Sequence, residues 1–181
     1  KLKQALNSTY KVISDNIEIK EKLEKNKKLK KFDFFEFDNL NTKSDFIKAR
    51  AETDSSALKK KFSNEEIYKK NLPLNSSCKS LYSIAEKIRY EALGAEMLKG
   101  INKNLKENYN QIISFKRKDQ LKTKEDVTIV EAFELYMLKK FHNIELNSLT
   151  NKMLDFWKND FDSSIGKHID YLKSNLENQN N

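Results

Sequence analysis

The sequence predicts a mainly α-helical single domain of about five to six helices, and it allows a small two-stranded or extended segment near residues 32–51. The chain has 181 residues, enough for one hydrophobic core but cramped for two. It contains three Gly and one Pro, so turns should be few and helices long. Apolar residues recur at steps of three and four in several stretches, which is the helical period.

The N-terminal part of the chain contains two predicted helices and the best strand signal in the sequence. Apolar positions place the first helix at residues 2–14. Four Phe residues between 32 and 37 alternate imperfectly with acidic residues, which is typical of a strand, and residues 46–51 are a candidate partner strand. The second helix is expected at residues 55–71, before Pro73. Asp54 is its predicted N-cap, although Ser63 with Glu66 could instead start a new helix.

The stretch from Leu81 to Leu105 reads as one long helix around which the rest should pack. Two apolar rows run along it, one from Leu81 to Ala95 and one from Leu93 to Leu105, so partners should cover it on more than one side. Ser76 or Ser77 is the predicted N-cap. Gly94 and Gly100 each cost a helix interior roughly 1 kcal/mol relative to Ala, which indicates close packing or a bend.

The C-terminal part should add further helices. Thr123, with Asp126 three residues later, is the predicted cap of a helix that extends to Phe141. A loop at residues 143–147 leads to a helical segment that starts at Ser148. Its final stretch has a regular amphipathic stripe, formed by Ile165, Ile169, Leu172 and Leu176.

Residues 82–105, YSIAEKIRYEALGAEMLKGINKNL, resemble a segment of the CobT subunit of aerobic cobaltochelatases. The matching positions are Ala85, Glu86, Arg89, Glu91, Ala92, Leu93, Gly94, Ala95, Met97, Gly100, Ile101, Asn104 and Leu105. Residues 152–179, which begin KMLDFW, are similar to the tail of the same domain. Residues 54–73 fall where the family has a D-S-x-A-L helix, and the opening LKQALNSTYKVIS resembles its first helix.

This resemblance implies that residues 1–181 are a CobT-like N-terminal helical domain. In that family the T subunit works with a CobS-like AAA+ ATPase and a large CobN-like subunit that inserts cobalt during cobalamin biosynthesis. The D-x-S-x-S motif of the family's C-terminal adhesion-type domain is absent from the sequence. The implied role is a non-catalytic interaction domain, with cobalt and ATP handled by partner subunits. The positions of Ser63 and Tyr68 depart from the family pattern, which has histidines nearby.

The residues themselves suggest no reaction centre, so we predict no catalytic, cofactor-binding or metal-binding residue. Asp160-x-Asp162-x-Ser164 begins like a calcium loop, but Ile165 replaces the required Gly and Tyr171 the bidentate Glu. No P-loop or HExxH motif occurs. His142 and His168 are expected on the surface or at the rim of the core. Whether the chain is part of an enzyme is open from the residues alone.

Charged residues supply the candidate partner-binding sites. The net charge is +8, and residues 20–31 contain seven Lys, among them Lys27, Lys28, Lys30 and Lys31. On the central helix the candidates are Glu86, Arg89, Glu91 and Glu96, with Glu86 and Arg89 spaced to pair. A basic module that binds nucleic acid or another anionic surface is the alternative, disfavoured because only three residues are Arg. A divergent AAA+-associated adaptor unrelated to cobalt is a further alternative, and a homo-oligomer is allowed.

The cellular setting is expected to be the cytoplasm. The single Cys excludes an internal disulfide, and no signal peptide opens the sequence. No run of about 18 apolar residues occurs, so no membrane span is expected.

Overall fold

The computed structural model describes residues 2–14, 41–115 and 121–180, and over these residues the chain is built from α-helices without any strand. The helices are α1 (Leu2–Ile13), α3 (Lys43–Phe62), α4 (Glu65–Asn71), α5 (Ser76–Met97), α6 (Lys99–Phe115), α7 (Ile129–Phe141), α8 (Ser148–Asp155), α9 (Lys158–Ser164) and α10 (Ile169–Ser174). Two short 3-10 turns, η3 (Lys124–Asp126) and η4 (Gly166–His168), precede α7 and α10. The predicted α class is confirmed, with more helices in the described residues than the five to six expected.

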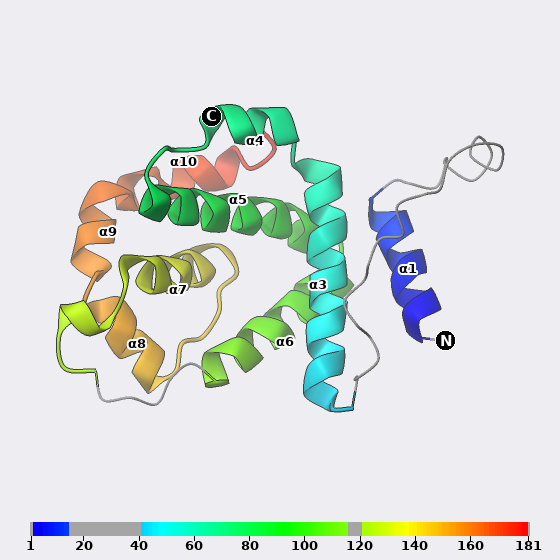
Figure 1. Ribbon diagram of the computed structural model, residues 1–181, viewed down its shortest axis with the longest axis horizontal. Coiled ribbons are helices and arrows are strands. Elements are labelled where there is room, and N and C mark those ends of the chain that lie inside the picture. Colours follow the sequence, from blue (N-terminus) through cyan, green and yellow to red (C-terminus); the bar gives the residue numbers. More distant parts are fainter. Residues whose placement is uncertain (1, 15–40, 116–120, 181) are drawn as a thin grey trace.

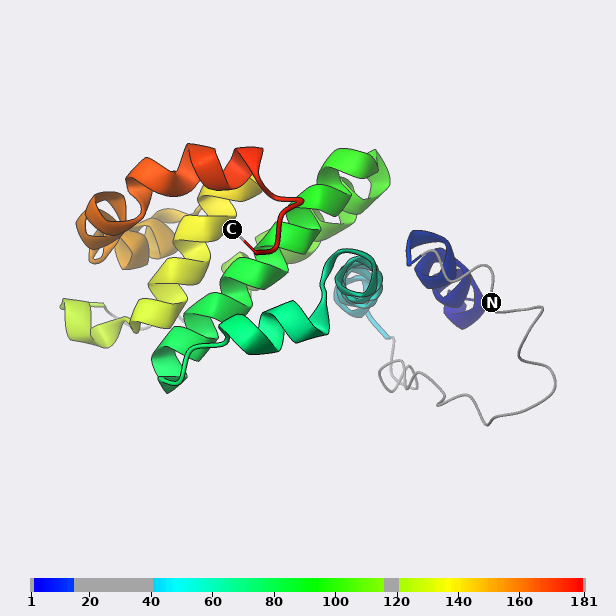
Figure 2. The same ribbon diagram turned by 90° about the horizontal axis from the view of Figure 1, so that it is seen from above.

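Helix α5 lies at the centre and packs against α3, α6 and α7. In Figure 1, α3 crosses one end of α5, and α1 lies on the outer side of α3. Figure 2 shows α7 beside α5, with the red C-terminal part passing over one end of α7 and then turning back beside α5. Side chains of five helices are fully buried in the core, among them Leu58, Ile88, Leu105, Leu135 and Met153. The expectation that the central apolar band needs partners on several sides is therefore confirmed.

The long helix predicted for residues 81–105 is broken at Leu98. The backbone of Leu98 is extended, with φ −137° and ψ 116°. The N–H of Leu98 donates to the carbonyl oxygen of Gly94, and this bond ends α5. Helix α6 begins at the next residue and takes a new direction (Figure 1). Apolar periodicity continues through the bend, so it did not reveal the break. We call residues 96–100 the elbow.

The two glycines of this region have different roles. A Cβ added to Gly94 would lie 2.3 Å from Cδ2 of Leu58 on α3, so Gly94 lets α3 and α5 approach closely. A Cβ added to Gly100 would meet no atom of the described part of the chain within 4 Å. Close packing therefore explains Gly94, whereas Gly100 lies in the first turn after the bend.

Replacing Gly94 with Ala is expected to destabilise the domain by about 1–2 kcal/mol, although Ala is the better helix former, because the methyl group overlaps the buried Leu58. The matched change Gly100→Ala should be neutral or stabilise by up to about 1 kcal/mol. Urea unfolding of both variants checks this. In a Leu58→Ala background the Gly94→Ala penalty should disappear; an unchanged penalty there would contradict the packing explanation.

Several local predictions were wrong at the N-terminal side of the core. Residues 46–51, the candidate partner strand, lie inside α3, whose N-cap Thr42 forms a capping box with Asp45. Asp54 lies buried in the middle of the same helix and caps nothing. Ser63 ends α3, and Asn64 caps α4. The Phe-rich stretch at residues 32–37 lies outside the described residues.

The remaining caps differ from the prediction by one or a few residues. Asn75, not Ser76 or Ser77, caps α5 through a bond to the N–H of Cys78. Thr123 starts only the η3 turn, while Thr128 and Glu131 form the capping box of α7. Short polar side chains cluster at these sites, and the sequence alone does not decide which of them turns back onto the helix.

The amphipathic stripe at the C-terminus is also divided. Residues 166–168 form η4, and α10 covers only Ile169–Ser174 before the chain turns. No helix among the described residues is long and apolar enough to span a membrane.

Candidate functional site

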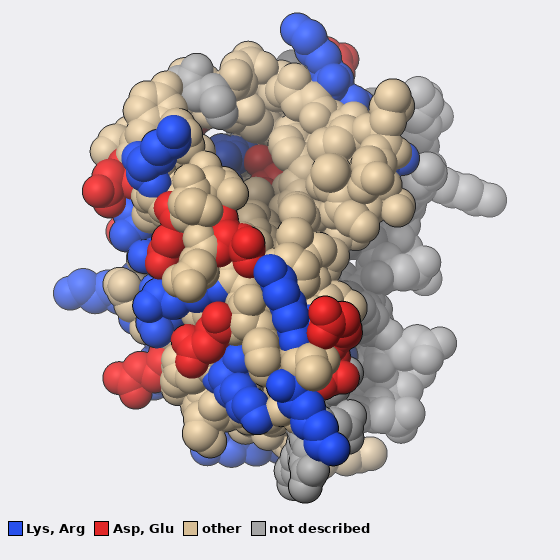
Figure 3. Space-filling model, turned by 90° about the vertical axis from the view of Figure 1, so that its left-hand side faces the viewer, with Lys and Arg blue, Asp and Glu red and all other residues tan. Residues whose placement is uncertain are grey.

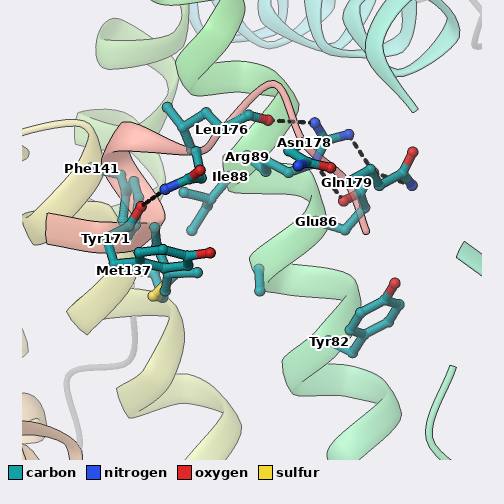
Figure 4. Close-up of a pocket in the computed structure, with 13 residues that line it drawn as sticks. Tyr82, Glu86, Ile88, Arg89, Met137, Phe141, Tyr171, Leu176, Asn178 and Gln179 are labelled. Carbon is teal, nitrogen blue, oxygen red and sulfur yellow. Dashed lines mark hydrogen bonds and ion pairs between the residues drawn. The ribbon is translucent and has the colours of Figure 1, made fainter. Parts of the chain in front are cut away.

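Arg89 of α5 joins three parts of the chain. Its Nε donates to Oε2 of Glu86 at 2.8 Å, which confirms the predicted pair. Its Nη2 donates to the carbonyl oxygen of Phe62 at 2.6 Å, at the end of α3, and its Nη1 to that of Leu176 at 2.7 Å. Only 12% of the Arg89 side chain is exposed, so this guanidinium clamps the interior of the domain (Figure 4).

Glu86 is the acceptor at the centre of this clamp. Besides Arg89, it accepts hydrogen bonds from Oγ of Ser63 at 2.7 Å and from Nε2 of Gln179 at 3.0 Å. Gln179 in turn accepts from the backbone N–H of Asn64 at 2.7 Å. The Glu86 carboxylate therefore fixes the junction of α3 and α4 to the C-terminal end of the described chain.

A cavity of about 230 Å³ lies next to the clamp. Its walls come from α5, α7 and α10 and are mainly apolar and aromatic, as Figure 4 shows for Ile88, Met137, Phe141 and Tyr171. Glu86, Arg89 and Gln179 border one end of it. Such a lining is suited to an apolar group.

A second buried polar cluster surrounds Glu91, one helical turn beyond the clamp. The Glu91 carboxylate accepts from Oγ of Ser55 and from the hydroxyl of Tyr109, each at 2.5 Å. Nζ of Lys87 lies 3.9 Å from Oε1, and Nε2 of His142 lies 3.8 Å from Oε2. Nε2 of His142 is buried and has no hydrogen-bond partner among the residues that the structure describes.

Burial controls the titration of this cluster. It raises the pKa of Glu91 and raises the pKa of Tyr109 well above its ordinary value, because the anionic forms lose hydration. Burial, with the positive charges of Lys106 and Lys87, lowers the pKa of His142 to about 4. The Glu91 carboxylate opposes that shift when it is ionised. His142 is thus a neutral core residue at pH 7, and its prediction as a surface or rim residue was wrong.

The two family-like motifs contact each other. In the D-S-x-A-L segment of α3, Asp54 accepts a hydrogen bond from Nδ2 of Asn104 at 2.7 Å, and its neighbour Ser55 bonds Glu91. Leu58 of the same segment packs on Gly94. The motif positions thus form the joint between α3 and the α5–α6 pair.

The third family-like block holds a loop in the same way. Nζ of Lys152 donates to the carbonyl oxygen of Leu121, and Nε1 of Trp157 donates to that of Val127 at 2.9 Å. Lys124 of this loop lies over the Trp157 ring, 4.1 Å from its centroid. The KMLDFW segment therefore fixes the residues that lead into α7.

The predicted partner-binding residues divide into three groups. Glu86, Arg89 and Glu91 lie in the interior, while Glu96 is exposed at the end of α5. Lys27, Lys28, Lys30 and Lys31 lie outside the described residues. A role for any of these residues in partner binding stays a prediction. Sequence reasoning missed Ser55 and Gln179 as partners of the motif carboxylates, although the D-S-x-A-L segment was a signal for the first.

The described residues contain no group of three or more His, Cys, Asp or Glu side chains that could hold a metal ion. In the stretch that resembles the start of a calcium loop, Asp160 pairs with Lys124 at 2.6 Å and Asp162 accepts from the Tyr136 hydroxyl at 2.9 Å. Figure 3 shows acidic and basic side chains intermixed on the face that it presents. Cys78 is exposed.

The family model described as "Cobalamin biosynthesis protein CobT" matches residues 1–181, the whole chain. The chain belongs to the CobT family. This membership connects the CobT chain with cobalamin biosynthesis and confirms the resemblance found in its motifs. No solved structure matches the chain significantly.

Proposed function

We propose that this CobT chain is a non-catalytic interaction domain of a subunit of the ATP-dependent aerobic cobaltochelatase, which inserts cobalt into the corrin precursor. It would dock to an AAA+ ATPase subunit, to the large chelating subunit, or to both. The observation that carries the proposal is the use of the family-like polar residues. Four of these side chains form hydrogen bonds within the domain: Glu86, Arg89, Glu91 and Asn104. These positions therefore support a role in stabilising the fold and not in forming a reaction centre.

The elbow is the longest continuous exposed run within the family-like segment, residues 82–105. Met97 is 42% exposed and Leu98 is 45% exposed, and Glu96 beside them is exposed as well. A surface-exposed apolar pair next to a carboxylate is a suitable contact for a protein partner. The exposed elbow therefore supports the proposal, and it is the surface at which we would test docking first.

The proposed mechanism is mechanical coupling. The AAA+ subunit would bind and hydrolyse ATP, and the chelating subunit would hold the corrin precursor and cobalt as substrates. The CobT domain would transmit the motion through its helical body, whose clamps at Arg89 and Glu91 resist internal deformation. The chain itself would supply neither a nucleotide site nor a cobalt site.

The test measures binding of the full-length CobT subunit to purified AAA+ and chelating subunits by calorimetry. We expect a complex with at least one of them, and the double variant Glu96→Lys, Met97→Ala should weaken it at least tenfold with an unchanged unfolding midpoint. The matched control Glu107→Lys, on α6, should bind normally. Binding to neither subunit, or stoichiometric ATP hydrolysis by the chain alone, would refute the proposal.

The same binding experiment, combined with a cobalt-insertion assay, distinguishes the proposed role from that of an AAA+-associated adaptor unrelated to cobalt. If the chain binds the AAA+ subunit but cobalt insertion proceeds equally well without it, the role is that of an adaptor unrelated to cobalt. The basic-module alternative depends on residues 20–31, which lie outside the described residues, and it stays a prediction. It requires affinity for DNA that falls steeply with salt.

A further inference from the structure

The geometry points to a releasable strap at the C-terminal end of the described chain. We define the C-terminal strap as residues 170–179, which follow the buried Ile169 and cross the cavity between α5 and α7 (Figure 4). We propose that the strap opens while the rest of the domain stays folded, and that opening uncovers the apolar floor formed by Ile88, Met137 and Phe141. This inference is independent of the partner proposed above.

The strap is held by little apolar contact. Leu176 is its one buried residue. It packs with Ala92 and Leu93 in a small cluster, and Phe62 and Phe141 connect this cluster to the main core, to which Ile169 belongs. Between these two points Tyr171 is 54% exposed, and the cavity lies beneath. A segment with so little burial is expected to open locally at a much lower free energy than the core helices.

Polar bonds at the far end close the strap. The carbonyl oxygen of Leu176 accepts from Arg89, and the Gln179 side chain bonds Glu86 and both backbone groups of Asn64. Arg89 and Glu86 keep their bonds to α3 and its end whether or not the strap is closed. The bonds of Gln179 and Leu176 can therefore break without dismantling the clamp.

The three Met residues of the chain provide matched probes of this motion. Met97 is exposed at the elbow, Met137 is 4% exposed and lines the cavity, and Met153 is fully buried in the main core. Opening of the strap exposes Met137 but leaves Met153 covered. Their oxidation by hydrogen peroxide, followed by peptide mass spectrometry, therefore distinguishes local from global opening.

In the full chain we expect Met97 to oxidise fastest, Met137 at an intermediate rate and Met153 slowest. Gln179→Ala should accelerate oxidation of Met137 about five- to tenfold, because it removes the hydrogen bonds of the Gln179 side chain to Glu86 and Asn64. It should leave the oxidation rate of Met153 unchanged. The matched control Asn180→Ala, at an exposed neighbouring position, should change neither rate.

Two results would overturn the proposal. The first is equal protection of Met137 and Met153 in the unmodified chain, with the same dependence on urea, since both would then react only through global unfolding. The second is equal acceleration of both residues by Gln179→Ala. Hydrogen exchange of the strap amides provides an independent measurement. If these amides exchanged as slowly as those of α5, the strap would open only with the whole domain, and the proposal would be overturned.

Discussion

Arg89→Met is expected to destabilise the domain by about 3–5 kcal/mol. The substitution keeps an apolar stem but removes the guanidinium that pairs with Glu86, and a mostly buried carboxylate loses its charge partner. The carbonyl oxygens of Phe62 and Leu176 lose their donor as well. Chemical unfolding followed by circular dichroism should show a lower midpoint with little change in the slope.

The double variant Glu86→Gln, Arg89→Met provides the decisive comparison. The double variant removes the unpaired charge of Glu86. It should therefore recover a clear part of the stability lost in Arg89→Met, because that loss comes from leaving a buried carboxylate uncompensated. Lys103→Met is the matched control, because the Lys103 side chain is 75% exposed and its surface pair with Glu107 is 3.9 Å long. A loss for Lys103→Met as large as that for Arg89→Met would contradict the clamp.

Glu91→Ala is expected to cost about 3 kcal/mol or more. The change leaves the hydroxyls of Ser55 and Tyr109 without their acceptor and opens space in the core. Glu91→Gln, which retains an acceptor oxygen, should cost far less. Thermal unfolding of both variants at pH 7 measures the difference.

Glu96→Ala is the control for this prediction, because Glu96 lies on the same helix but is exposed. It should change the stability by less than about 0.5 kcal/mol. If Glu91→Ala were no more destabilising than Glu96→Ala, the buried network would contribute nothing to the fold. A loss for Glu91→Gln as large as that for Glu91→Ala would show that the negative charge itself is required.

The sequence predicted the helices from periodicity because most of them bury one face. That method could not find the break at Leu98, where apolar residues recur on both sides of the bend. It also misread residues 46–51 as extended. In α3 the buried positions include Thr53 and Asp54 between small alanines, so the apolar pattern of the helix is weak.

For the candidate site, spacing revealed the contact between Glu86 and Arg89 because both lie on one helix three residues apart. The bonds to Ser63, Leu176 and Gln179 join segments that are distant in the sequence, and a single sequence contains no record of such pairs. The sequence also did not reveal that Glu86, Arg89 and Glu91 are buried, because charged residues are rarely buried, and we therefore predicted them as partner-binding residues.

The bend at Leu98 is a geometric necessity for the joint with α3. Asp54 and Ser55 are neighbours on α3, yet their partners Asn104 and Glu91 are separated by thirteen positions. On one straight helix these partners would be about 20 Å apart along the axis and point about 140° away from each other. Two adjacent side chains could not reach both. The length of chain through the bend is therefore constrained by the fold, whereas the fold makes no such demand on the side chain of Leu98, which lies at the surface.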